Sequence, residues 1–227
     1  MPTITIPYKP RKVQAELHKQ VSKHRFSVIV AHRRLGKTIC VLMQQIRDAL
    51  QTKKPNYRGV YIAPTVTMAK SVAWDYVKTF TAKIPDTNYN EAELRVDFPN
   101  GSRIQLVGAN DGGNRLRGRA LDSCIIDETQ AMPSELFNQI LRPALVDRNG
   151  MMGEDTWAIF IGTPQLQNYF YELHKFAERT DGWYTVVLPA NKTGVVPEDE
   201  LRQAREIMGE SAYAQEFLCD FNADIEG

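Results

Sequence analysis

The sequence has few of the features that mark secreted, membrane or metal-stabilised proteins. Its three cysteines, Cys40, Cys124 and Cys219, lie in apolar surroundings at no metal-ligand spacing, which is typical of reduced core residues. It has no apolar run of about 18 residues, and Met1–Ile4 lacks the apolar core of a signal peptide. No repeat or low-complexity tract is visible. We therefore expect a soluble intracellular domain with no membrane partner.

The length and the distribution of charge narrow the possibilities further. With 227 residues the chain can form one large domain, or one domain with a small appendage. The net charge of +1 is the sum of two oppositely charged halves, because residues 1–120 carry a net charge of +13 and residues 121–227 a net charge of −12. This split has two interpretations: one face meets a polyanion, or the two halves neutralise each other in the fold.

Short apolar runs alternate with longer segments of helical spacing. The runs have the length of strands and are nearly continuous, as in strands buried on both faces of a parallel sheet; they cover residues 26–31, 59–63, 123–126 and 156–161. The segments of helical spacing cover residues 37–52, 66–84, 134–145 and 166–178. This alternation predicts an α/β fold with a mostly parallel sheet flanked by helices. One hairpin is also predicted, because residues 94–98 and 103–107 flank the turn pair Asn100-Gly101.

The alternation changes near Trp183. A strand-like run at 184–188 precedes a segment that Pro197 can open as a helix, and Gly209 separates that helix from a further one at 211–219. We expect a core at residues 1–180 and a small C-terminal lid subdomain at 181–227.

The clearest chemical signal lies at the end of the first apolar run. The segment Ala31-His32-Arg33-Arg34-Leu35-Gly36-Lys37-Thr38 has the spacing of a phosphate-binding loop, G-x-x-x-x-G-K-[ST], with Ala31 in place of the first glycine. In such a loop, backbone N–H groups and the helix N-terminus surround the phosphates. Lys37 would reach the β- and γ-phosphates, and Thr38 would offer its hydroxyl to Mg²⁺.

Two adjacent carboxylates end a later apolar strand. Because successive side chains leave a strand on opposite sides, Asp127 and Glu128 should face different surroundings. Asp127 would hold Mg²⁺ beside Thr38, and Glu128 would polarise the attacking water. Together with the loop, this pair predicts a Mg²⁺-dependent nucleoside triphosphatase.

Two weaker signals fit the same activity. Thr163 follows the strand that ends at Ile161, where a polar residue can sense the γ-phosphate, although an ordinary βα turn has the same composition. Tyr8, Arg11 and Gln14 precede the first strand and could read or stack on adenine, whereas by themselves they are more typical of a plain N-terminal helix.

Arginines that could stabilise the transition state occur at two places. Arg33 and Arg34 lie within the loop, and Arg115, Arg117 and Arg119 follow the glycine-rich connection 111–113. The second cluster could project an arginine into a neighbouring subunit or bind DNA phosphates, and the sequence leaves both uses open.

Taken together, these segments resemble the large terminase subunits of tailed double-stranded DNA bacteriophages, the motors that package DNA. The loop is similar to that family's variant phosphate loop, and Leu116-Arg117-Gly118 is similar to its element before the acidic strand. Further similar segments are 127–130, 141–150, 161–173 and Ala214-Gln-Glu-Phe217.

The resemblance implies a RecA-like additional-strand P-loop ATPase core and roles for single residues. Glu128 would be the catalytic carboxylate and Thr163 the coupling residue. Arg117 would be a finger supplied in trans, with Arg33 as a finger in cis as the competing assignment. Tyr8, Arg11 and Gln14 become candidates for the adenine site, and Arg115 and Arg119 remain candidates for DNA binding.

The implied ligands are ATP and Mg²⁺, and the implied partners are double-stranded DNA, the portal protein and the small terminase subunit. The chain would form a homo-oligomeric ring on the procapsid in the cytoplasm of the host, and it could be a monomer in isolation. Family members carry a second, nuclease domain, which should begin where this sequence ends, so we expect no DNA cleavage. Two alternatives are the N-terminal RecA-like half of a superfamily 2 helicase, and a nucleotide-switched DNA-binding or assembly module without turnover.

Overall fold

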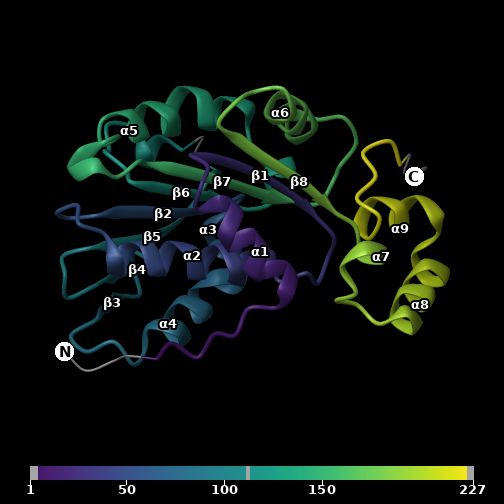
Figure 1. The fold of residues 1–227 in the computed structure, drawn as a ribbon, viewed down its shortest axis with the longest axis horizontal. Helices are drawn as coiled ribbons and strands as arrows, with labels where there is room; N and C mark the ends of the chain where they lie inside the picture. Colours follow the sequence, from purple (N-terminus) through teal and green to yellow (C-terminus); the bar gives the residue numbers. More distant parts are fainter. Residues whose placement is uncertain (1–4, 111–112, 224–227) are drawn as a thin grey trace.

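One eight-stranded sheet organises the chain (Figure 1), as described by a computed structural model for residues 5–110 and 113–223. The strands run in the order β3-β4-β5-β2-β6-β7-β1-β8. Their bounds are β1 Phe26–Ala31, β2 Arg58–Ala63, β3 Asn88–Asn90, β4 Arg95–Asp97, β5 Arg103–Gly108, β6 Ser123–Ile126, β7 Trp157–Gly162 and β8 Trp183–Leu188. The β3-β4 and β4-β5 pairings are antiparallel, and the other pairings are parallel.

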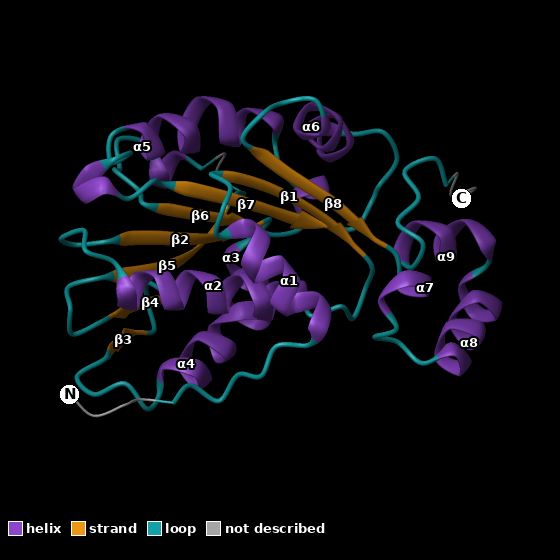
Figure 2. Ribbon diagram, viewed as in Figure 1, coloured by secondary structure: helices purple, strands orange, loops and turns teal. Residues whose placement is uncertain are grey.

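Helices cover both faces of this sheet, as Figure 2 shows. On one face lie α1 Lys12–Val21, α2 Lys37–Gln51, α3 Val66–Ala69 and α4 Asp75–Thr81, with the π-helical segment Lys70–Trp74 between the last two. On the other face lie the π-helical segment Leu136–Leu141, α5 Arg142–Val146 and α6 Tyr169–Glu178. Short 3₁₀ turns occur at Asn114–Leu116, Thr129–Ala131 and Met151–Gly153.

The alternation of side chains along β1 shows how the two faces are filled. Ile29 and Ala31 pack into the core that contains α2, whereas Val28 and Val30 pack into the core on the opposite face. All six residues of β1 are buried. The nearly continuous apolar pattern that predicted a two-sided parallel strand is therefore confirmed.

The predicted hairpin is present, and one strand lies elsewhere than expected. β4 and β5 pair across the turn that contains Gly101, with Asp97 opposite Arg103. The strand at 183–188, which we assigned to the lid, instead pairs in parallel with β1 along its whole length. Its side chains are mostly half-buried because β8 is an edge strand with one neighbour, a position that the apolar pattern alone does not reveal.

Three helices follow β8 and lie beside the end of the sheet (Figure 1). They are α7 Ala190–Thr193, α8 Glu198–Met208 and α9 Glu210–Glu216. Ala190, Tyr213 and Phe217 form a small separate core among them. α8 begins after Pro197 with three acidic residues in its first turn and ends at Gly209, as the sequence predicted.

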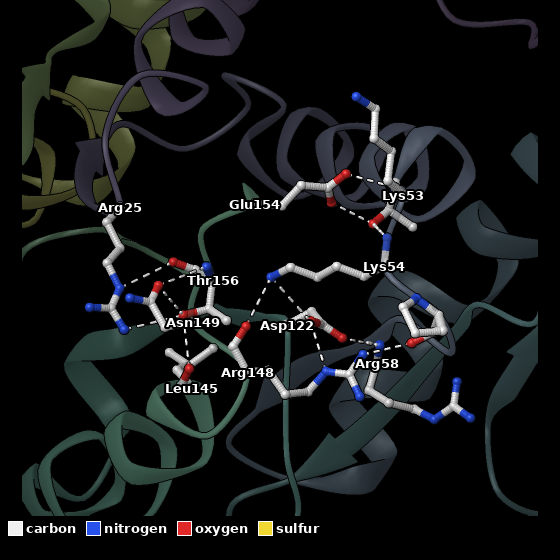
Figure 3. A network of polar contacts seen from close by, with 12 residues as sticks. Arg25, Lys53, Lys54, Arg58, Asp122, Leu145, Arg148, Asn149, Glu154 and Thr156 are labelled. Atoms are coloured by element: carbon white, nitrogen blue, oxygen red, sulfur yellow. Dashed lines mark hydrogen bonds and ion pairs between the residues drawn. The ribbon is translucent and has the colours of Figure 1, made fainter. Parts of the chain in front are cut away.

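A buried polar network joins the amino-terminal ends of the central strands (Figure 3). Asp122, directly before β6, accepts hydrogen bonds from the Arg58 N–H at 2.7 Å and from Arg148 Nε at 2.9 Å. The Lys54 amine lies 3.4 Å from the same carboxylate. These contacts fix the start of β6 against that of β2, and so help to set where its opposite end lies. Within 5–110 and 113–223, no helix is long and apolar enough to cross a membrane.

Candidate nucleotide-binding and hydrolysis site

The loop between β1 and α2 has the backbone that phosphate binding requires. Gly36 has φ +83°, in the left-handed region that favours glycine, and Lys37 begins α2. A Cβ on Gly36 would lie 2.8 Å from Gln14 Nε2, so the glycine also permits a close approach of the first helix. Arg34 has a positive φ of 65° as well, so the chain reverses sharply between β1 and the start of α2.

Lys37 lies over this loop. Its amine donates to the carbonyl oxygens of Ala31 at 2.9 Å and His32 at 3.3 Å. Burial lowers the pKa of Lys37, although Glu128 and Asp127 act in the opposite direction. A buried ammonium held by carbonyl dipoles is a group that an anionic phosphate would stabilise.

Thr38 and Asp127 meet across two elements that are far apart in sequence. Thr38 Oγ1 donates to Asp127 Oδ2 at 2.9 Å, and the Tyr61 hydroxyl on β2 donates to the same oxygen at 2.5 Å. Asp127 is 2% exposed, and burial raises its pKa in spite of these hydrogen bonds. A hydroxyl and a carboxylate are hard oxygen ligands of the kind that Mg²⁺ prefers, and a cation would relieve the buried negative charge.

The side chains of Glu128 and Asp127 diverge for a reason other than the one we expected. β6 ends at Ile126, so alternation along a strand does not apply to this pair. Instead Glu128 has φ +52°, and its N–H donates to Asp127 Oδ1 at 2.8 Å. The turn directs Glu128 to a half-buried position where Gln130 Nε2 donates to its carboxylate. The two acids do face different surroundings, as predicted, because of this left-handed turn.

Thr163 lies at the end of β7, between the loop strand and the acidic strand. β7 pairs with β1 on one side and with β6 on the other. The Thr129 hydroxyl donates to the carbonyl oxygens of Ile126 and Ile161, which joins the ends of β6 and β7. The structure therefore brings Thr163 to the same edge of the sheet as Lys37, Asp127 and Glu128.

The three candidates for the adenine site, Tyr8, Arg11 and Gln14, do not all lie in the same place. Arg11 donates to the Leu35 carbonyl at 3.1 Å and Gln14 donates to the Gly36 carbonyl at 3.1 Å, so both side chains contact the loop. The structure does not bring Tyr8 there. Its hydroxyl lies 3.0 Å from His18 Nε2, and its ring packs edge-on against Phe80 of α4, because an apolar surface is available to it away from the loop.

Two side chains from the residues after β8, those of Thr193 and Glu216, contact the loop, and the sequence assigned a role to neither. His32 Nε2 lies 2.8 Å from Thr193 Oγ1, and Arg33 Nε lies 3.0 Å from Glu216 Oε2. Burial lowers the pKa of His32, so the imidazole is favoured in its neutral form. Glu216 falls in a segment that carried the family resemblance, whereas no sequence signal singled out Thr193 or Tyr61.

The second arginine cluster lies apart from the loop. Arg117 is exposed, and its Nε donates to Asn114 Oδ1 at 3.1 Å. Arg119 donates to Gln105 Oε1 at 2.9 Å, and Arg115 lines a small pocket with it. Asp111 and Gly112 of the glycine-rich connection lie outside the described residues.

Comparison with known proteins identifies the arrangement. A family described as "Terminase large subunit, T4likevirus-type, N-terminal" matches residues 28–224. The chain belongs to this terminase family. It is 27% identical over 183 residues to the terminase large subunit of Thermus phage G20c and to that of Thermus virus P23-45, in each case across 73% of this chain and 36% of the relative. The chain thus spans about a third of the length of these relatives.

Solved terminase structures share the fold. The large terminase ATPase domain of Thermus phage P74-26 superposes with a TM-score of 0.78 at 21% identity, over 95% of each chain. The large terminase of another thermophilic bacteriophage, solved in complex with ADP, superposes with a TM-score of 0.76 at 14% identity, over 93% of this chain and 53% of that one. The expected α/β fold, with β7 as an additional strand between the loop strand β1 and the acidic strand β6, is confirmed.

Proposed function

We propose that this chain is the Mg²⁺-dependent, ATP-hydrolysing part of a DNA-packaging terminase, which drives double-stranded DNA into the procapsid. One observation carries the proposal: Thr38 Oγ1 and Asp127 Oδ2 lie 2.9 Å apart, so the phosphate loop and the acidic strand form one site. Membership of the terminase family and the fold shared with a terminase solved with ADP support the same activity.

Each residue of the site has a distinct part in hydrolysis. Backbone N–H groups of 32–38 and the start of α2 would hold the phosphates, with Lys37 reaching them from the loop. Thr38 and Asp127 would hold Mg²⁺, which offsets the negative charge of the phosphates. Glu128 would take the proton of the attacking water. Thr163, at the end of the intervening strand, would respond to loss of the γ-phosphate, and Arg11 and Gln14 would border the nucleotide.

A neighbouring subunit would complete the site with Arg117. The alternative in cis, Arg33, has its guanidinium beside the Glu216 carboxylate at 3.0 Å. Arg117 is exposed on a short turn, where it can reach another molecule. Arg33 is exposed as well, so the difference lies in its pairing with a carboxylate, and this pairing supports Arg117 as the residue that stabilises charge in the transition state.

Translocation would use residues outside the site. Helices α7–α9, joined to the loop through Thr193 and Glu216, would form the part that moves. Arg115 and Arg119 would contact DNA phosphates, consistent with the basic balance of residues 1–120. Portal protein, the small terminase subunit and a homo-oligomeric ring on the procapsid in the host cytoplasm complete the proposal, which assigns no nuclease activity to these residues.

The decisive experiment measures Mg²⁺-dependent ATP turnover as a function of protein concentration. The specific rate should rise with concentration and fall by about 10³-fold or more in Arg117→Ala. Arg179→Ala, which removes an exposed arginine from another surface, is the matched control and should change nothing. Glu128→Gln should abolish turnover while ATP still binds.

Three results would contradict parts of the proposal. A constant specific rate that Arg117→Ala leaves unchanged would place the arginine in cis. Turnover that survives Glu128→Gln would remove the catalytic assignment. DNA binding that is insensitive to salt would exclude phosphate contacts as its main source.

A further inference from the structure

We infer that Gln130 is a positioning residue, which fixes the carboxylate of Glu128 and connects it mechanically to the end of β7 at Thr163. The inference rests on the proposed function, because it assumes that Glu128 acts on the attacking water. Gln130 lies in the 3₁₀ turn Thr129–Ala131, directly after the acidic pair.

The first contact is with the carboxylate itself. Gln130 Nε2 donates a hydrogen bond to Glu128 Oε2. Glu128 needs such a restraint, because its backbone is in the left-handed region and its side chain could otherwise adopt several rotamers. A bond to one carboxylate oxygen selects a rotamer and leaves the second oxygen for a proton from water.

Gln130 is itself held in place. The backbone carbonyl oxygen of Gln130 accepts a hydrogen bond from Asn168 Nδ2 at 2.9 Å. Asn168 caps α6, where its Oδ1 accepts from the Phe170 N–H at 3.0 Å. The turn that carries Gln130 is therefore attached to the first turn of a packed helix, and its side chain acts from a fixed base.

The other end of the amide meets the main chain of β7. Gln130 Oε1 is buried, and no donor among the described residues reaches it. It would clash with a Cβ built on residue 162, so Gly162 is what allows the amide to fit. Gly162 is the last residue of β7 and precedes Thr163.

The arrangement makes Gln130 a two-ended link. One end holds Glu128, and the other lies against the backbone whose next residue responds to the γ-phosphate. A buried acceptor without a donor is destabilising, and a small shift of the β7 end that brings an N–H or O–H to Oε1 would relieve this. Movement at Thr163 would in this way change the position of the Glu128 carboxylate.

The test is the pH dependence of kcat and KM for Mg²⁺-ATP in Gln130→Ala and Gln130→Glu, with the exposed Gln139→Ala as matched control. Gln130→Ala should lower kcat on the order of 10- to 100-fold, as loss of a supporting partner does at comparable sites, while KM stays within about twofold. Gln130→Glu should move the acid limb of kcat to higher pH, because a second carboxylate beside Glu128 disfavours ionisation of both. A merely structural role would not lower kcat in Gln130→Ala while leaving KM unchanged.

A double-mutant cycle tests the connection to β7. The backbone of Gly162 is not in the left-handed region, and a Cβ there would lie 2.2 Å from Gln130 Oε1 and 3.0 Å from Phe170 Cε1. Gly162→Ala therefore acts first by pushing the amide of Gln130, which is the closer contact. It should lower kcat alone and have little further effect in the Gln130→Ala background. Additive effects of the two substitutions would overturn the link.

Other outcomes are equally decisive. An unchanged kcat in Gln130→Ala would overturn the inference, as would an increased kcat, which would mean that the amide restrains Glu128 in an inactive position. Absence of turnover in the unsubstituted chain would instead count against the proposed function. In that case hydrogen exchange with ATP-γ-S still tests the link: protection at 161–164 and at 127–130 should change together, and Gln130→Ala should uncouple them. Unchanged coupling in that variant would refute it.

Discussion

Replacing Asp122 by asparagine should lower the free energy of unfolding by about 3–5 kcal/mol. The side chains of Asp122 and Lys54 are each 1% exposed, and they lie 3.4 Å apart (Figure 3). Asparagine keeps the shape of the side chain but removes its charge, so the Lys54 ammonium would remain buried without a carboxylate. Leaving one charge of a buried pair uncompensated costs more than the pair contributes.

The reverse substitution should be much milder. In Lys54→Met the carboxylate of Asp122 keeps Arg148 Nε at 2.9 Å and the Arg58 N–H at 2.7 Å, so it stays satisfied. Methionine has a similar length and no charge to bury, and the expected cost is about 1 kcal/mol or less. In the double variant Asp122→Asn/Lys54→Met the orphaned ammonium is gone, and about 2 kcal/mol of the loss should be recovered.

Urea unfolding of the four proteins at pH 7 measures these differences, with the slope m as the check that the unfolded state is unchanged. The reasoning fails if Asp122→Asn costs less than about 1 kcal/mol, or if Lys54→Met costs as much as Asp122→Asn. It also fails if the two substitutions are additive, because the structure couples them through one contact.

Two further predictions concern the loop. Gly36→Ala should destabilise the protein by about 1–2 kcal/mol through left-handed strain, and it should also weaken ATP binding as measured by titration calorimetry. Gly118 is the control, because it has φ +72° and open space around it. Gly118→Ala should therefore show the loss of stability without the loss of ATP binding. For His32, burial lowers the folded-state pKa, so the unfolded chain binds the proton more readily and stability should fall as pH drops below about 6.5. Relative to His32→Gln, the loss in urea unfolding should reach at most about 1.4 kcal/mol per pH unit and level off below the folded-state pKa; identical pH profiles would contradict this.

Much of the fold followed from residues whose surroundings are determined locally. The run 26–31 had to be a two-sided strand because all of its side chains but one are apolar, and the structure buries all six. The spacing from Ala31 to Thr38 then located the loop and the start of α2 within one residue. The hairpin turn followed similarly from Asn100-Gly101.

What the sequence could not provide was the neighbourhood of each element. Tyr61 contacts Asp127 because β2 lies beside β6, which depends on strand order and not on spacing. The place of β8 at the edge of the sheet and the contact of Glu216 with Arg33 are likewise properties of assembly. The packing of the Tyr8 ring against Phe80 of α4 is another such property, and the role of Tyr8 at the adenine site stays a prediction.

The order of the strands also explains why the residues of the site depend on one another. β1 and β6 are separated by β7, so two strand spacings, about 10 Å, lie between the strand that leads into the loop and the acidic strand. Thr38 nevertheless reaches Asp127, because α2 starts over the end of β7 and carries the hydroxyl across it. Thr163 directly follows the strand that this contact crosses, and Gln130 lies against Gly162, the last residue of that strand. A displacement of the β7 end would therefore disturb both Thr38 and Asp127, the proposed Mg²⁺ ligands, on one side and the contact of Gln130 with Glu128 on the other. In the proposed mechanism this strand end is the place where nucleotide state can alter the whole site.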